Sequence, residues 1–311
     1  MPRLFDIKKI PLITWQNMAP PFTGHTYFQH ARHFPFNALA ENFSPVNAWW
    51  LSEAALLSYA AEDFSGPWFE KAGFDNLWFF SGHSTQCYVA AAGDLAVVAF
   101  RGTECGLDQG PEAMARFVAD LSVDLDIRWV DGKGGGRIHR GFRDALDEIW
   151  PDLKACLDQY LSNGNPLWIT GHSLGGALAL LAADRLLPQK KVQGVYVFGA
   201  PRIGDQRFAE GFSPRAFSIV NNNDVVPHLP PFPYADLGEM HYIDSKGILH
   251  SRIGRGERWM DRIQGHIQCL IENVRHWDQG LAASLPDWIK DHTPLLYAVH
   301  LWNHLIYSTP P

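Results

Sequence analysis

Hydrophobic and polar residues follow two different periods along the chain, and the period changes several times between residues 47 and 220. Apolar residues at steps of three and four predict helices over residues 47–61, 141–161 and 174–187. Short β-branched and aromatic runs predict two strands within residues 82–100, and further strands over 167–170, 192–198 and 216–220. Strands that alternate with helices indicate an α/β fold whose mostly parallel sheet is covered by helices on both faces.

The two ends of the chain differ from this alternating region. Residues 1–45 are rich in Pro, Phe and His without a clear period, which predicts an irregular N-terminal arm. Residues 257–311 are expected to form a C-terminal helical region. Because no repeat or long low-complexity linker divides the chain, we expect one domain over residues 1–311.

Composition and charge exclude several classes of protein. The 311 residues are 46% hydrophobic and carry a formal net charge of -7, whereas nucleic-acid binding requires a basic surface. The four cysteines lie far apart, and His and Asp lack the spacing of metal ligands, so we expect no metal and no cofactor. There is no classical signal peptide and no apolar run of membrane-spanning length, which gives a cytoplasmic location as the default expectation and no transmembrane segment.

A catalytic motif follows the predicted strand at 167–170. Residues 171–175 read Gly-His-Ser-Leu-Gly, which fits the G-x-S-x-G nucleophile elbow between a strand and a helix. In such a turn glycines avoid backbone collisions and the serine hydroxyl is exposed, so Ser173 is the expected nucleophile. The helix that begins at Leu174 directs free N–H groups toward Ser173, and the N–H of Leu174 is the expected first oxyanion donor.

Several further segments resemble the class three lipases, which are α/β-hydrolases that act on acylglycerols and related lipid esters. The similar segments, in chain order, are VVAFRGT at 97–103, ADL at 119–121, HRGF at 139–142, GHSLGG at 171–176, FGAPRIGD at 198–205 and NDVVP at 223–227. The resemblance implies the α/β-hydrolase fold and a second oxyanion role for Thr103, which would otherwise be an ordinary turn residue. It also places a candidate lid loop at residues 104–116, for which a static surface loop is the alternative.

Asp224 is the expected acidic member of a Ser-His-Asp triad. It follows the strand predicted at 216–220 and satisfies the order Ser, Asp, His that the elbow predicts. An Asn-rich loop before proline would by itself indicate only an Asx-turn at this aspartate. The similarity of residues 223–227 to the family's aspartate segment favours the catalytic role.

Two histidines compete for the third position. Asp291-His292, followed by Tyr297, resembles a segment of the bacterial members, whereas His300-Leu301-Trp302 resembles one of the fungal members. We prefer His292, because it precedes a Thr-Pro helix start and is therefore expected on a loop. His300 would lie in the middle of an apolar helix, where a buried structural histidine is commoner.

These residues predict a serine carboxylic-ester hydrolase that works through an acyl-enzyme. The resemblance implies lipase activity on acylglycerols, which is the leading interpretation. A phospholipase, galactolipase, short-chain esterase or acyltransferase with the same triad is the alternative, and a non-catalytic lipid-binding relative is a third. The expected partners are a lipid or other ester substrate and, transiently, a lipid interface.

Overall fold

The computed structural model describes residues 5–14, 21–93, 95–102, 129–161, 165–187, 192–276 and 286–308. The helices are α1 (Pro45–Leu57), α2 (Glu62–Ala72), α4 (Arg140–Asp147), α5 (Trp150–Tyr160), α6 (Leu174–Leu186), α7 (Gln206–Gly211), the 3-10 turn η1 (Val226–His228), α8 (Arg255–His276), α9 (Asp287–Asp291) and α10 (Pro294–Ser308). The strands are β1 (Asn76–Ser81), β2 (Gln86–Ala92), β3 (Leu95–Phe100), β4 (Trp129–Asp131), β5 (Arg137–His139), β6 (Leu167–His172), β7 (Val192–Phe198), β8 (Ala216–Asn221), β9 (Glu239–Ile243) and β10 (Leu249–His250).

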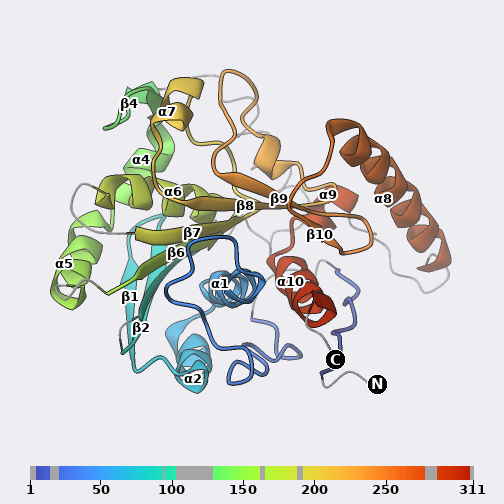
Figure 1. Cartoon of the computed structure of the whole chain (residues 1–311), viewed down its shortest axis with the longest axis horizontal. Coiled ribbons are helices and arrows are strands. Elements are labelled where there is room, and N and C mark those ends of the chain that lie inside the picture. The colour runs from blue at the N-terminus through green and yellow to red at the C-terminus, as the bar shows by residue number, and fades with distance from the viewer. Residues whose placement is uncertain are drawn as a thin grey trace.

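An eight-stranded sheet runs through the centre of the molecule in the order β1-β2-β3-β6-β7-β8-β9-β10 (Figure 1). The strands from β3 to β9 pair in parallel, and antiparallel pairs close the sheet at both edges. Since parallel strands end at the same edge, the segments that follow β6 and β8 are brought close together there. This edge carries the candidate site.

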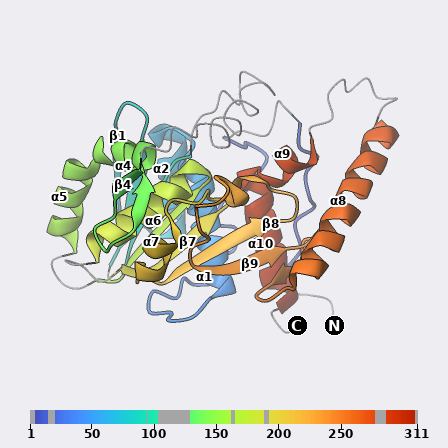
Figure 2. The same cartoon turned by 90° about the horizontal axis from the view of Figure 1, so that it is seen from above.

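Two hydrophobic clusters lie on the two faces of the sheet. One joins α1, α10 and the N-terminal arm, and the other joins α4, α5 and α6 (Figure 1). The central strands β6 and β7 are buried throughout, as expected for parallel strands covered on both faces. Helix α8 stands outside this arrangement, at the flank of the sheet beyond β9 (Figure 2).

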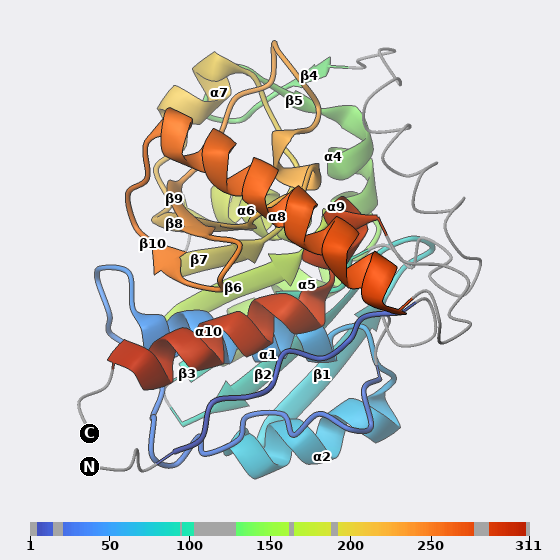
Figure 3. The same ribbon diagram turned by 90° about the vertical axis from the view of Figure 1, so that its right-hand side faces the viewer.

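The N-terminal arm contains no helix or strand within residues 5–14 and 21–44. Residues 5–14 run along α10 (Figure 3). Lys8 exchanges two backbone hydrogen bonds with the Asn303 side chain, and Trp302 donates to the carbonyl of Asp6. The arm therefore satisfies its polar backbone groups by pairing with side chains of α10.

The prediction of one continuous helix over residues 141–161 was wrong. The structure has two helices there, α4 and α5. Pro151 lies in the first turn of α5. Proline has no N–H and is tolerated in a first turn but not in a helix interior, so the chain ends one helix and begins another. Across the described parts of the chain, no helix is both long enough and apolar enough to cross a membrane.

Candidate active site

Ser173 occupies a sharp turn between the end of β6 and the beginning of α6. Its backbone φ is 56°, a left-handed conformation that is uncommon for a residue with a side chain. A Cβ at Gly171 would lie 2.3 Å from the carbonyl of Gly175, and a Cβ at Gly175 would lie 2.3 Å from the carbonyl oxygen of Phe100. Both positions are glycine because the backbones of β3, β6 and α6 meet beneath the serine.

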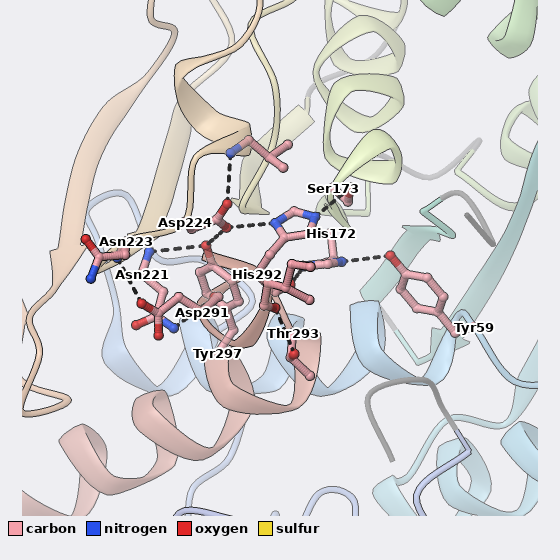
Figure 4. Close-up of polar contacts among 12 residues, drawn as sticks. Tyr59, His172, Ser173, Asn221, Asn223, Asp224, Asp291, His292, Thr293 and Tyr297 are labelled. Carbon is pink, nitrogen blue, oxygen red and sulfur yellow. Dashed lines mark hydrogen bonds and ion pairs between the residues drawn. The ribbon is translucent and has the colours of Figure 1, made fainter. Parts of the chain in front are cut away.

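His292 lies on the short connection between α9 and α10. Its Nε2 atom is 2.9 Å from Oγ of Ser173, and its Nδ1 atom is 2.8 Å from Oδ2 of Asp224 (Figure 4). A carboxylate only accepts hydrogen bonds, so Nδ1 carries the proton and the lone pair of Nε2 faces the serine hydroxyl. The imidazole is therefore oriented to accept a proton from Ser173.

The fully buried carboxylate of Asp224 uses both of its oxygens. Oδ1 accepts from the backbone N–H of Val226 at 2.9 Å, two residues further along the chain. Oδ2 accepts from His292 and, at 2.6 Å, from the hydroxyl of Tyr297. The Asx-turn and the contact with the imidazole thus coexist at this residue, one on each oxygen.

Sequence reasoning assigned no role to Tyr297, which lies on α10 one turn beyond His292. Its hydroxyl donates to Asp224 and accepts from the backbone N–H of Asn221 at 3.1 Å. Burial and, after it, the negative charge of Asp224 raise the pKa of Tyr297 well above its usual value, so the phenol keeps its proton. The signal was present in the sequence, since Tyr297 belongs to the segment that favoured His292.

The asparagines before Asp224 join its loop to the loop of His292. Asn221 donates from its side chain to the carbonyl of Asp291 at 2.9 Å, and the backbone N–H of Asn223 donates to the Asp291 carboxylate at 3.0 Å. Burial, followed by the neighbouring charge of Asp287, raises the pKa of Asp291 well above its usual value. These bonds hold the two loops in a fixed relative position.

His300, the competing histidine, lies in the middle of α10 against the turn at Gly247. A Cβ at Gly247 would lie 2.4 Å from Nδ1 of His300. Burial lowers the pKa of His300 to about 4, slightly opposed by the charge of Asp244. The structure therefore brings His292 to Ser173 and packs His300 as a neutral core residue.

The expected oxyanion donors fall in two different parts of the chain. Leu174 is the first residue of α6, so its N–H has no acceptor within the helix and lies beside Ser173. Thr103 and the candidate lid at residues 104–116 lie outside the described residues. The preceding Gly102 is described, and a Cβ there would lie 1.9 Å from the Tyr59 hydroxyl.

Part of the chain is similar to known lipases. The model of the family described as Lipase (class 3) matches residues 97–234. A secreted mono- and diacylglycerol lipase of Malassezia globosa is 37% identical over 202 residues, covering 60% of this chain and 59% of the relative. Phospholipase A1-II 2 of Oryza sativa subsp. indica is 29% identical over 248 residues, covering 63% of this chain and 58% of the relative. The match thus spans less than two thirds of either curated relative.

A solved structure shows the same fold. The triacylglyceride lipase of Rhizomucor miehei superimposes with a TM-score of 0.50 at 27% identity, covering 63% of this chain and 78% of the lipase.

The expectation of a cytoplasmic location was wrong. The Malassezia relative and a mono- and diacylglycerol lipase of Fusarium solani are both named as secreted proteins, which points to an extracellular location. The expectation was only a default, because neither the fold nor the catalytic residues report where a protein is delivered.

The motifs at 97–103 and 171–176 lie within the matched region, and the mostly parallel sheet is that of the solved fungal lipase. Residues 97–234 are similar to the class 3 lipase family, and the chain has the α/β-hydrolase fold.

Proposed function

We propose that this chain hydrolyses carboxylic esters of lipids through an acyl-enzyme on Ser173. The observation that carries the proposal is the continuous line of hydrogen bonds from Ser173 through His292 to Asp224. A hydroxyl, an imidazole and a buried carboxylate in this order form the arrangement that activates a serine for attack on an acyl group.

In the first half-reaction, Nε2 of His292 takes the proton of Ser173 while Oγ attacks the ester carbonyl carbon. The negative charge that develops on the carbonyl oxygen is stabilised by the N–H of Leu174 and, by resemblance, by Thr103. The bond from carbon to the alcohol oxygen then breaks, and His292 returns the proton to the leaving alcohol. Asp224 holds the imidazole in its tautomer and stabilises the imidazolium.

In the second half-reaction, water replaces the alcohol. His292 removes a proton from the water as its oxygen attacks the acyl carbon, and the second tetrahedral intermediate releases Ser173, which recovers the proton. The products are a carboxylic acid and the free enzyme. All proton transfers pass through one imidazole atom, which explains why both ring nitrogens need defined partners.

Acylglycerols are the substrate class that we favour, and phospholipids are the second candidate. The relatives named above include a mono- and diacylglycerol lipase and a phospholipase A1. Both names support action on lipid esters, and the Malassezia name, which describes a secreted protein, supports a place outside the cell. Transient contact with a lipid interface, with residues 104–116 as the candidate lid, is proposed from the resemblance alone. The two names differ in the kind of lipid, an acylglycerol in one and a phospholipid in the other, so they leave the head group of the substrate open.

A fluorophosphonate probe and an ester series test the proposal. We expect the wild type to be labelled at Ser173 and to hydrolyse acyl esters, and Ser173→Ala to lose both properties. His292→Ala is expected to reduce kcat by about 10⁴-fold or more, whereas His300→Ala keeps it within about threefold. Full turnover by Ser173→Ala would disprove the mechanism. Diacylglycerol and phosphatidylcholine presented in the same micelles would decide the head group.

A further inference from the structure

A second buried histidine lies beside the triad and takes no part in the proton transfers described above. His172 is the last residue of β6 and directly precedes Ser173 in the chain. The residue is 3% exposed, and its ring centroid lies 4.6 Å from that of His292 (Figure 4). A buried polar ring in this position requires hydrogen-bond partners.

Both ring nitrogens of His172 have such partners. Nε2 lies 2.7 Å from the backbone carbonyl oxygen of His292, and Nδ1 lies 2.7 Å from the hydroxyl of Tyr59. A carbonyl oxygen can only accept, so Nε2 carries the proton. In a neutral ring Nδ1 then accepts, and the Tyr59 hydroxyl donates to it. The two partners together select one tautomer of His172.

The ring of His172 is neutral at physiological pH. Burial, followed by the influence of His292, lowers the pKa of His172 well below its usual value, against a smaller opposite effect of the bond to the carbonyl. Neutrality matters here because a cation at this distance would oppose the protonation of His292 during acylation.

The contact between Tyr59 and His172 requires a glycine at position 102. Tyr59 follows the C-terminal end of α1 and is buried, and Gly102 follows β3. A Cβ at Gly102 would lie 1.9 Å from the Tyr59 hydroxyl and 2.8 Å from the carbonyl oxygen of His172. The ends of α1, β3 and β6 therefore converge on one hydrogen-bonded pair.

We propose that His172, oriented by Tyr59, is a positioning residue that sets the distance between Oγ of Ser173 and Nε2 of His292. One residue is joined to the nucleophile by a peptide bond and to the backbone of the base by a hydrogen bond. Loss of that hydrogen bond would free the loop of His292 to move relative to the elbow, although Asp224 still holds the ring. This inference rests on the proposed function.

The chain offers a pair of variants that separates the hydrogen bonds from the packing. Gln at position 172 has an amide N–H for the carbonyl of His292 and an amide oxygen for Tyr59, whereas Leu has neither. We expect His172→Leu to lower kcat and the rate of fluorophosphonate labelling of Ser173 by about 10- to 100-fold with KM nearly unchanged. His172→Gln is expected to recover most of the loss, and Tyr59→Phe to show a smaller decrease of the same kind.

A control variant distinguishes positioning from general loss of stability. Leu157→Ala creates a cavity at a fully buried residue of α5, in the other hydrophobic cluster, and is expected to lower Tm without changing the labelling rate.

Wild-type labelling rates in both His172→Leu and Tyr59→Phe would overturn the inference and leave the proposed function intact. A His172→Gln variant that is labelled as slowly as His172→Leu at equal Tm would also overturn the inference. A wild type that does not label would overturn the proposed function itself. If His172→Leu fails to fold, Tyr59→Phe and His172→Gln still give the answer.

Discussion

The hydroxyl of Tyr297 donates a 2.6 Å hydrogen bond to Oδ2 of Asp224, the same oxygen that accepts from His292. Tyr297 and His292 lie on one continuous stretch of chain at the start of α10, so that a single segment supplies both donors. The carboxylate is thereby held by this segment as well as by the N–H of Val226 in its own loop. This relationship gives Tyr297 a measurable role.

Tyr297→Phe removes one donor from a buried carboxylate and leaves the ring in place. We expect the free energy of unfolding to fall by about 1.5 to 3 kcal/mol, as for hydrogen bonds to charged groups, and kcat to fall by about tenfold. Chemical denaturation and ester hydrolysis measure the two effects. Tyr88→Phe is the matched control, because Tyr88 donates to the carbonyl of Ala60. It should lower stability by about 1 kcal/mol and leave kcat unchanged. An unchanged kcat in Tyr297→Phe would contradict the role.

His300 should make the stability of the protein depend on pH between about 6.5 and about 4. Because its pKa is lowered in the folded state, the unfolded chain binds a proton in this range that the folded chain does not. The free energy of unfolding therefore falls as pH decreases through this range, by about 3 kcal/mol for this one group.

Other buried histidines respond in the same direction, so the test of His300 is a difference between variants. Denaturant unfolding from pH 7 to pH 4 should show a shallower pH dependence for His300→Gln than for the wild type. His33→Gln, at an exposed histidine, is the control for the substitution itself. Equal slopes for His300→Gln and the wild type would contradict the prediction.

Gly175→Ala should prevent formation of the elbow. The new Cβ would lie 2.3 Å from the carbonyl oxygen of Phe100, where backbone on both sides cannot yield. We expect loss of labelling at Ser173 together with a large loss of stability. In contrast, Gly256 lies within α8, and a Cβ added there would meet no atom within 4 Å beyond its chain neighbours, so Gly256→Ala should stabilise the protein by about 0.5–1 kcal/mol. A well-folded, fully active Gly175→Ala protein would show that the turn is less tightly packed than the distances indicate.

A buried carboxylate joins the N-terminal arm to α1. Glu53 is fully buried and accepts from His25 at 2.9 Å and from Trp49 at 3.1 Å, with Lys8 at 3.5 Å. Burial alone would raise the pKa of Glu53, but the charges of His25 and Lys8 outweigh it and the pKa lies below its usual value. The stabilising effect is therefore present above pH 4.5 and is lost as pH falls below it.

His25→Ala should remove a hydrogen bond from this buried carboxylate and destabilise the protein by about 1.5 to 3 kcal/mol. Replacing Glu53 by Gln in the same variant should recover part of the loss, because the buried charge is then removed. Thermal unfolding of the single and double variants measures both effects. If the double variant is no more stable than His25→Ala, the contribution of His25 to stability comes from its packing rather than from its interaction with the charge of Glu53.

The sequence by itself determined the α/β alternation, the nucleophile elbow and the order of the expected triad. These features are local, since an elbow needs glycines at fixed positions and a buried parallel strand needs a short apolar run. Periodicity could not locate the break between α4 and α5, where one proline outweighed the continuing helical pattern.

The sequence favoured His292 over His300, which lies eight residues further along and belongs to a plausible motif of its own, but only the tertiary structure placed His292 beside Ser173. The choice depends on which side of α10 meets the ends of β6 and β8, and that follows from packing of α10 against α1. For the same reason, the bonds of Tyr297 to Asp224 and of His172 to the His292 backbone join residues 73 and 120 positions apart. Local sequence patterns cannot predict contacts between residues so far apart in the chain, because these contacts are set by how whole helices and strands pack together.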